Sequence, residues 1–236
     1  MKIILASGSP RRAELLAVSG YPFQVRVASI DEENIQEQVL TELTDLPGSA
    51  QQLELVRRLS AAKAHAVYAE LSASHFADHS DLFVEGAQHK SVILAADTIV
   101  CLDDAILGKP HSPAEAEKML RQLAGRTHLV HTGVALLLLS ASGELLATEN
   151  IVETTEVSFL PLNTALECRL QTYVSSGVPL DKAGAYGIQD YGALFVSGIK
   201  GDYYNVMGLP LAKVTALLDR WQSVEEGEAA ADTCSN

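Results

Sequence analysis

The sequence predicts an α/β fold in which helices flank a mixed, twisted sheet. Short apolar segments alternate with helical patterns at the start of the chain, and two long strand-like runs joined by a short turn follow in its middle. Alternation is typical of parallel strands linked by helices, whereas a tight turn joins antiparallel strands. With 236 residues and 47% hydrophobic content, the chain can bury a core as one large domain or as two small lobes.

The first part of the chain supplies the alternation. We expect a strand over Lys2–Ala6, a helix over Pro10–Ser19 that ends at a glycine, and a second strand over Phe23–Val27. A polar segment, 31–50, then leads into a helical pattern that carries Lys63.

An exposed insertion is expected over Ser72–Lys90, which is rich in His, Ser, Asp and Ala and shows little periodicity. Its histidines and His65 lack the fixed spacing of zinc ligands, so they do not indicate a zinc site. A buried strand over Val92–Ala96 follows and is expected to end at Asp97 and Thr98.

The second half contains a capping box and a long hairpin. Ser112–Glu115 has the pattern that opens a helix, here to Leu123. A Ser/Gly-rich turn joins two strand-like runs, Thr127–Leu139 and Glu144–Phe159. They predict a long hairpin, and an antiparallel hairpin beside parallel strands would make the sheet mixed. The remaining expected elements are a helix over Asn163–Val174, a loop over 181–189, a short hairpin at Gly201–Asp202, a helix over Pro210–Trp221 and a disordered acidic tail over 224–236. Residues 1–223 are thus expected to form a single domain.

Composition excludes several classes of protein. The formal charge of -13 opposes general binding to nucleic acid or to an anionic membrane surface. The longest apolar run, 133–139, is too short to cross a membrane. Three cysteines, odd in number and far apart, favour a reduced cytoplasmic location.

The segment Ser7–Arg12 predicts a phosphate-binding site. Small residues allow backbone N–H groups to approach an anion, Ser9 can cap a helix whose first residue is Pro10, and Arg11 and Arg12 lie in its positive first turn. The alternative is a simple helix start with solvated arginines, and this segment taken alone does not separate the two.

Asp97 is the main candidate for chemistry, because its carboxylate can hold Mg²⁺ or accept a proton from a water molecule. The alternative is a cap for the following turn. Glu32 offers a second carboxylate, which taken alone suits a solvated face equally well. Lys109 follows a glycine and precedes Pro110, so it can approach a phosphate, although the segment is not the nucleotide P-loop.

Several segments agree in order and spacing with one family. They are Ala6–Arg12, Asp31–Glu32, Ala96–Val100, Gly108–Pro110, Asp181–Gln189 and Gly208–Leu211. Over roughly residues 1–221 the chain therefore resembles the Maf proteins, nucleoside triphosphate pyrophosphatases related in fold to the inosine triphosphate pyrophosphatases. The resemblance implies two lobes around an active-site cleft, a cytoplasmic homodimer and Mg²⁺, or Mn²⁺, as the cofactor.

The resemblance also implies a reaction: hydrolysis of a nucleoside triphosphate between the α- and β-phosphates, with water as the nucleophile. Asp97 matches the family's proton acceptor, and its other active-site positions match Ser7, Arg12, Glu32, Lys63 and Lys109. Glu32 and Asp97 would hold the metal. Whether Asp97 binds metal, removes the proton or does both is left open.

Base selection in this family is associated with positions that correspond to Arg11, Thr98 and Gln189, and this set resembles the dTTP and UTP branch. An amide such as Gln189 can both accept from N3–H and donate to a carbonyl of uracil or thymine. CTP and modified pyrimidine nucleotides are further candidate substrates. The alternative function is a nucleotide-sensing regulator of cell division or septum formation that binds without turnover.

Overall fold

The structure, a computed structural model, describes residues 1–27, 29–73 and 90–233, with side chains as far as residue 223. Its strands are β1 (Lys2–Leu5), β2 (Phe23–Val25), β3 (Ser91–Leu102), β4 (Ala105–Leu107), β5 (Thr127–Leu139), β6 (Leu145–Phe159) and β7 (Val196–Lys200). Its α-helices are α1 (Pro10–Val18), α2 (Glu32–Glu42), α3 (Gly48–Ala73), α4 (Pro113–Leu123), α5 (Thr164–Ser175), α6 (Tyr203–Met207) and α7 (Leu211–Thr233). Among the described residues there are also three short 3₁₀-helices, η2 (Val178–Asp181), η3 (Ala183–Ala185) and η4 (Tyr191–Phe195).

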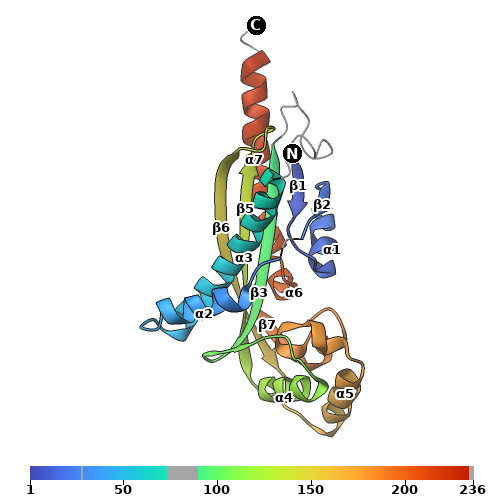
Figure 1. The fold of residues 1–236 in the computed structure, drawn as a ribbon. Helices are drawn as coiled ribbons and strands as arrows, with labels where there is room; N and C mark the ends of the chain where they lie inside the picture. Colours follow the sequence, from blue (N-terminus) through green and yellow to red (C-terminus); the bar gives the residue numbers. More distant parts are fainter. Residues whose placement is uncertain (28, 74–89, 234–236) are drawn as a thin grey trace.

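The strands form one seven-stranded mixed sheet in the order β2-β1-β3-β5-β6-β7, with β4 paired to β3 beside this path. β1 pairs parallel with β2 and β3, and the remaining pairs are antiparallel. Figure 1 shows β3, β5 and β6 running through the length of the molecule, with α7 extending at one end and α4 and α5 at the other. The predicted mixed sheet flanked by helices is confirmed.

Alternation along β3 distributes its side chains between two helical layers. Ile93 and Ala95 pack with residues of α3, whereas Val92, Leu94 and Ala96 pack with residues of α1 and α7. This is the consequence of a strand buried on both faces, where each successive side chain meets the opposite layer. The same alternation directs the next two side chains to opposite layers: Asp97 lies on the α3 side and Thr98 on the α1 side.

A second lobe is built on the far halves of the same long strands. Its core joins α4, α5 and the 3₁₀-helices to apolar residues of β3, β5 and β6. His128 lies inside this core, edge-on to Phe159 and Tyr186, and its Nε2 is 2.8 Å from the Tyr186 hydroxyl. Burial lowers the pKa of His128 to about 4, so the ring is neutral near pH 7.

One edge of β3 carries a gap between two partner strands. β1 pairs with β3 only as far as Leu94, and β4 pairs with it only from Val100 onward. Over 95–99, β3 therefore has no neighbouring strand on this edge within the described ranges. Asp97 was predicted at the end of a strand and instead lies inside one, because the β-branched and apolar residues after it continue the strand to Leu102.

Three further expectations differ from the structure. The polar segment 31–50 forms α2 and the start of α3, since Asp31 accepts a hydrogen bond from the Asn34 N–H and caps α2. No hairpin forms at Gly201–Asp202, because Asp202 caps α6 by accepting from the Tyr204 and Asn205 N–H groups.

The third difference concerns the acidic tail, which was expected to be disordered over 224–236. α7 continues through it to Thr233, since a run rich in Ala and Glu readily extends a helix that has already begun. The predicted insertion Ser72–Lys90 falls mostly outside the described residues, although residues 72 and 73 end α3. None of the described helices is both long enough and apolar enough to cross a membrane.

Candidate active site

A cleft of about 460 Å³ opens at the gap in the edge of β3 and is lined by residues of both lobes. Eight predicted site residues line it: Arg11, Arg12, Glu32, Lys63, Asp97, Thr98, Lys109 and Gln189. The ninth, Ser7, is buried and contacts Arg12. The tertiary structure thus gathers residues that are as far apart in the sequence as Ser7 and Gln189.

Three charged side chains converge on the α3 side of the cleft. The Lys63 ammonium forms an ion pair with Asp97 and a second with Glu32, at 2.8 Å. Asp97 comes from β3, Lys63 from α3 and Glu32 from the first residue of α2. The Asp97 and Lys63 side chains are only 12% and 18% exposed, so water screens their attraction weakly. The Lys63 ammonium thus keeps the Asp97 and Glu32 carboxylates close together.

The α3 helix reaches this position because β5 carries a glycine there. Gly133 lies directly opposite Asp97 in the sheet, and a Cβ on it would lie 2.2 Å from the Val56 backbone oxygen of α3. A side chain of any size would push the helix outward. Gly133 therefore allows α3 to bring Lys63 down to Asp97.

The guanidinium of Arg12 lies on the other side of β3. Its Nε donates to the Gly208 backbone oxygen at 2.8 Å, Nη1 donates to Ser7 Oγ at 3.1 Å, and Nη2 donates to Thr98 Oγ1 at 3.0 Å. Burial lowers the pKa of Arg12 and the Asp97 carboxylate opposes this shift, so the group stays charged. Two of its five N–H donors remain for a ligand.

The start of α1 partly matches the predicted phosphate-binding segment. Ser9 occupies the N-cap and Pro10 the first helical position, as expected, but the Ser9 side chain makes no capping hydrogen bond. Instead, the Ser9 N–H donates to Ser7 Oγ at 3.3 Å. Ser9 itself lines the cleft.

Asp181 and Lys182 lie in the segment 181–189 that the sequence marked, although no role was predicted for either residue, and they stabilise the wall of the cleft opposite α3. Arg11 donates to Asp181 at 3.1 Å and so joins α1 to η2. The buried Lys182 ammonium donates to Asp181 at 2.6 Å and to the Val178 oxygen at 2.8 Å. Although burial raises the pKa of Asp181, hydrogen bonds from Lys182 and Arg11 lower it overall. An adjacent acid and base in a glycine-containing loop was the available signal.

Lys109 and Gln189 are exposed at the cleft, and neither forms a hydrogen bond with any of the described residues. Lys109 extends from the segment after β4, which Gly184 anchors by donating to the Gly108 oxygen at 3.1 Å. Both side chains are therefore available to a ligand. The cleft combines fixed groups near β3 with free groups along its rim.

The donor set suits a hard divalent cation. Glu32 and Asp97 supply two carboxylates around a position where a cation, the Lys63 ammonium, already lies. Mg²⁺ is usually held by one or two carboxylates together with water and substrate phosphates. Among the described residues no group of three or more His, Cys, Asp or Glu gathers, so the chain itself would supply only part of such a shell.

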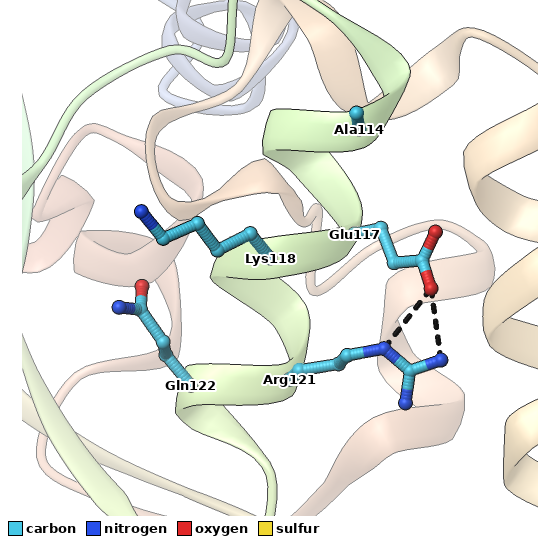
Figure 2. A pocket seen from close by; sticks show the side chains of 5 residues that line it. All are labelled: Ala114, Glu117, Lys118, Arg121 and Gln122. Atoms are coloured by element: carbon cyan, nitrogen blue, oxygen red, sulfur yellow. Dashed lines mark hydrogen bonds and ion pairs between the residues drawn. The ribbon is translucent and has the colours of Figure 1, made fainter.

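A second hollow, on the outer face of α4, contains none of the predicted site residues (Figure 2). It is lined by Ala114, Glu117, Lys118, Arg121 and Gln122. Its side chains project from one helix, and Arg121 pairs with Glu117 at 2.8 Å within the same helix. This hollow is a surface feature, whereas the cleft joins several elements.

The fold and the cleft together describe an α/β protein whose cleft holds fixed and free cationic side chains beside two carboxylates. The chain belongs to the Maf-like protein family, whose sequence profile matches residues 2–221. The chain is 42% identical over 222 residues to the dTTP/UTP pyrophosphatase of Bacillus mycoides (strain KBAB4), covering 94% of this chain and 96% of that protein.

Two other relatives carry the same description. The dTTP/UTP pyrophosphatase of Moorella thermoacetica (strain ATCC 39073 / JCM 9320) is 42% identical, over 92% of this chain and 93% of its own. That of Symbiobacterium thermophilum is 43% identical, over 93% and 94%. A solved structure, the nucleoside-triphosphatase / dITP/XTP pyrophosphatase of Mycobacterium abscessus, matches with a TM-score of 0.28 at 14% identity, over 67% of this chain and 73% of that chain.

Proposed function

We propose that this protein hydrolyses dTTP and UTP to the nucleoside monophosphate and pyrophosphate. The observation that carries the proposal is the pair of carboxylates, Glu32 and Asp97, held by Lys63 beside the oriented guanidinium of Arg12. The relatives that match nearly the whole chain are named dTTP/UTP pyrophosphatases, which supports this substrate class.

In the proposed mechanism Asp97 accepts the proton of the attacking water. Its carboxylate is weakly exposed and held in place by Lys63, so it is oriented before substrate arrives. A divalent cation bound by Glu32 and Asp97 would neutralise charge on the phosphates. The two free N–H groups of Arg12 bind phosphate oxygens, and Lys109 adds a second positive charge from the rim.

We propose that Gln189, at the rim of the cleft, recognises the base. The Gln189 amide can accept from N3–H and donate to a carbonyl of uracil or thymine. The two bases differ by one methyl group, which a pocket distinguishes weakly, so we expect both triphosphates to be substrates. CTP and modified pyrimidine nucleotides are to be tested beside them.

The test is product identification with UTP, dTTP, CTP, GTP, ATP and 7-methyl-GTP in the presence of Mg²⁺. We expect pyrophosphate and monophosphate from UTP and dTTP. The Asp97→Asn variant, which keeps the shape of the side chain, is expected to lose at least about 10³-fold in kcat. EDTA should abolish turnover. Release of orthophosphate would contradict the proposed bond, and saturable nucleotide binding without turnover would favour the regulator.

We further propose, from the family resemblance, a cytoplasmic location and a homodimer. Light scattering on the purified full chain tests the second point directly. A mass of about twice the 25.2 kDa of one chain is the expected result, and the mass of a single chain would contradict it.

A further inference from the structure

A line of hydroxyl groups runs from Arg12 through the sheet. Thr98 Oγ1, which accepts from Arg12 at 3.0 Å, lies 2.9 Å from Thr132 Oγ1. Thr132 Oγ1 in turn lies 3.1 Å from the backbone oxygen of Asn205. Thr132 stands directly opposite Thr98 on β5, Asn205 belongs to α6, and both are completely buried. Four elements, α1, β3, β5 and α6, are linked by this one chain of hydrogen bonds.

The direction of the chain follows from which groups carry hydrogen. A carbonyl oxygen cannot donate, so Thr132 donates to Asn205. That uses the single hydrogen of the Thr132 hydroxyl, so Thr98 donates to Thr132. The Thr98 oxygen therefore presents a lone pair to Arg12, which can only donate. Every bond in the chain points away from the guanidinium.

We infer that Thr132 is a positioning residue for Arg12. By accepting the Thr98 hydrogen, it keeps that hydrogen away from the guanidinium and keeps a lone pair turned toward it. With Ser7 and Gly208 accepting the other two bonds, the guanidinium is fixed before a ligand binds. Its two remaining donors are thereby oriented toward a polyphosphate, which lowers the entropy cost of binding.

The Thr132→Val variant tests whether the Thr132 hydroxyl is required, and it disturbs the packing little. Valine has nearly the shape of threonine, and the Asn205 oxygen keeps a second donor, the Gly208 N–H, at 2.9 Å. Thr155 on β6 is the matched control. It is equally buried, accepts from Asn205 Nδ2 and the Asp202 N–H, and donates to the Asp202 oxygen, but its hydroxyl has no hydrogen bond to Thr132, Thr98 or Arg12.

The first experiment measures calorimetric binding of inorganic tripolyphosphate to the full-length protein without added metal. Thr132→Val is expected to weaken binding about 10-fold, the size of one charge-assisted hydrogen bond. Thr132→Ser, which keeps the hydroxyl, and Thr155→Val should remain within about 2-fold of the wild type. Unchanged affinity in Thr132→Val, an equal loss in Thr155→Val, or no binding by the wild type would overturn the inference.

A double-mutant cycle asks whether Thr132 acts through Arg12. In an Arg12→Lys background, Thr132→Val should cause no further loss of tripolyphosphate affinity, whereas additive losses would contradict the inference. The inference rests on the proposed function for the choice of a polyphosphate ligand, but different results would contradict the inference and the proposed function. Absence of pyrophosphate release from UTP and dTTP by the wild type would overturn the proposed function only, because tripolyphosphate binding needs no turnover.

Discussion

Two clusters in this protein share one pattern, a cation between two carboxylates, in different surroundings. In the cleft, Lys63 holds Asp97 and Glu32 from three separate elements. On the outer surface, Arg121 of α4 holds Glu117 of the same helix and Glu167 of α5.

Exposure separates the central ion pair of the cleft cluster from the surface cluster. The Lys63 and Asp97 side chains are 18% and 12% exposed, whereas the three surface side chains are between 32% and 40% exposed. Glu32, the outer member of the cleft cluster, is 56% exposed. Water and salt screen the surface cluster, so it adds little beyond joining two helices. The Lys63–Asp97 pair lies in weakly screened surroundings, and burying these charges costs stability unless a partner or ligand offsets it. A largely buried ion pair that lines a cleft is a candidate functional site.

The largest expected effect comes from removing the cation of each cluster. Lys63→Met should lower kcat for UTP about 10³-fold, because the carboxylates lose their common partner and the phosphates lose a positive charge. Arg121→Met should leave kcat within about 2-fold of the wild type. Steady-state kinetics on both variants test this difference, and similar losses of kcat in the two variants would contradict it.

The next effect concerns His128, which is buried with no charged partner among the described residues and stays neutral. Its pKa is lowered to about 4 by burial, against about 6.5 in the unfolded chain. Between these values the unfolded chain binds a proton that the folded chain does not, so the free energy of unfolding falls by about 3 kcal/mol as the pH is lowered through that range. Urea unfolding at several pH values should show a smaller fall in His128→Phe, and equal falls would contradict the assignment.

A smaller effect is expected at Gly133, which allows α3 to place Lys63 against Asp97. Gly133→Ala should reduce stability by about 1–3 kcal/mol, because its Cβ collides with the Val56 oxygen. It should also lower kcat, since Lys63 moves with its helix. Gly198 lies in the edge strand β7 with open space around it, so Gly198→Ala is the matched control. Thermal unfolding and kinetics together distinguish displacement of the helix from a general effect of alanine.

The smallest effect belongs to the surface cluster. Hydrogen bonds from Arg121 lower the pKa values of Glu117 and Glu167. Their stabilising contribution is therefore present above the ordinary glutamate pKa and is lost as the pH falls through the lowered values. Glu167→Gln should shift the melting temperature by less than about 2 °C near neutral pH, and by less still in acid. A large shift would mean that α4 and α5 depend on this ion pair.

Features that depend on neighbouring residues were predictable from the amino-acid sequence alone. The alternating apolar pattern predicted β1, β5 and β6, and the capping box predicted α4, where Ser112 accepts from the Glu115 N–H. The motifs around Arg12 and Asp97 identified the family. These signals are local, because a helix cap or a strand period is complete within a few residues.

The assembly of the site, in contrast, depends on long-range packing and became visible only in the folded structure. Lys63 meets Asp97 because α3 packs closely over Gly133, and Arg12 is oriented by Thr98 because β3 pairs with β5 in one register. α2, which carries Glu32, was not predicted, since its single fully buried apolar residue leaves no helical stripe to read. Register and helix packing depend on contacts far apart along the chain, and local sequence patterns do not contain that information.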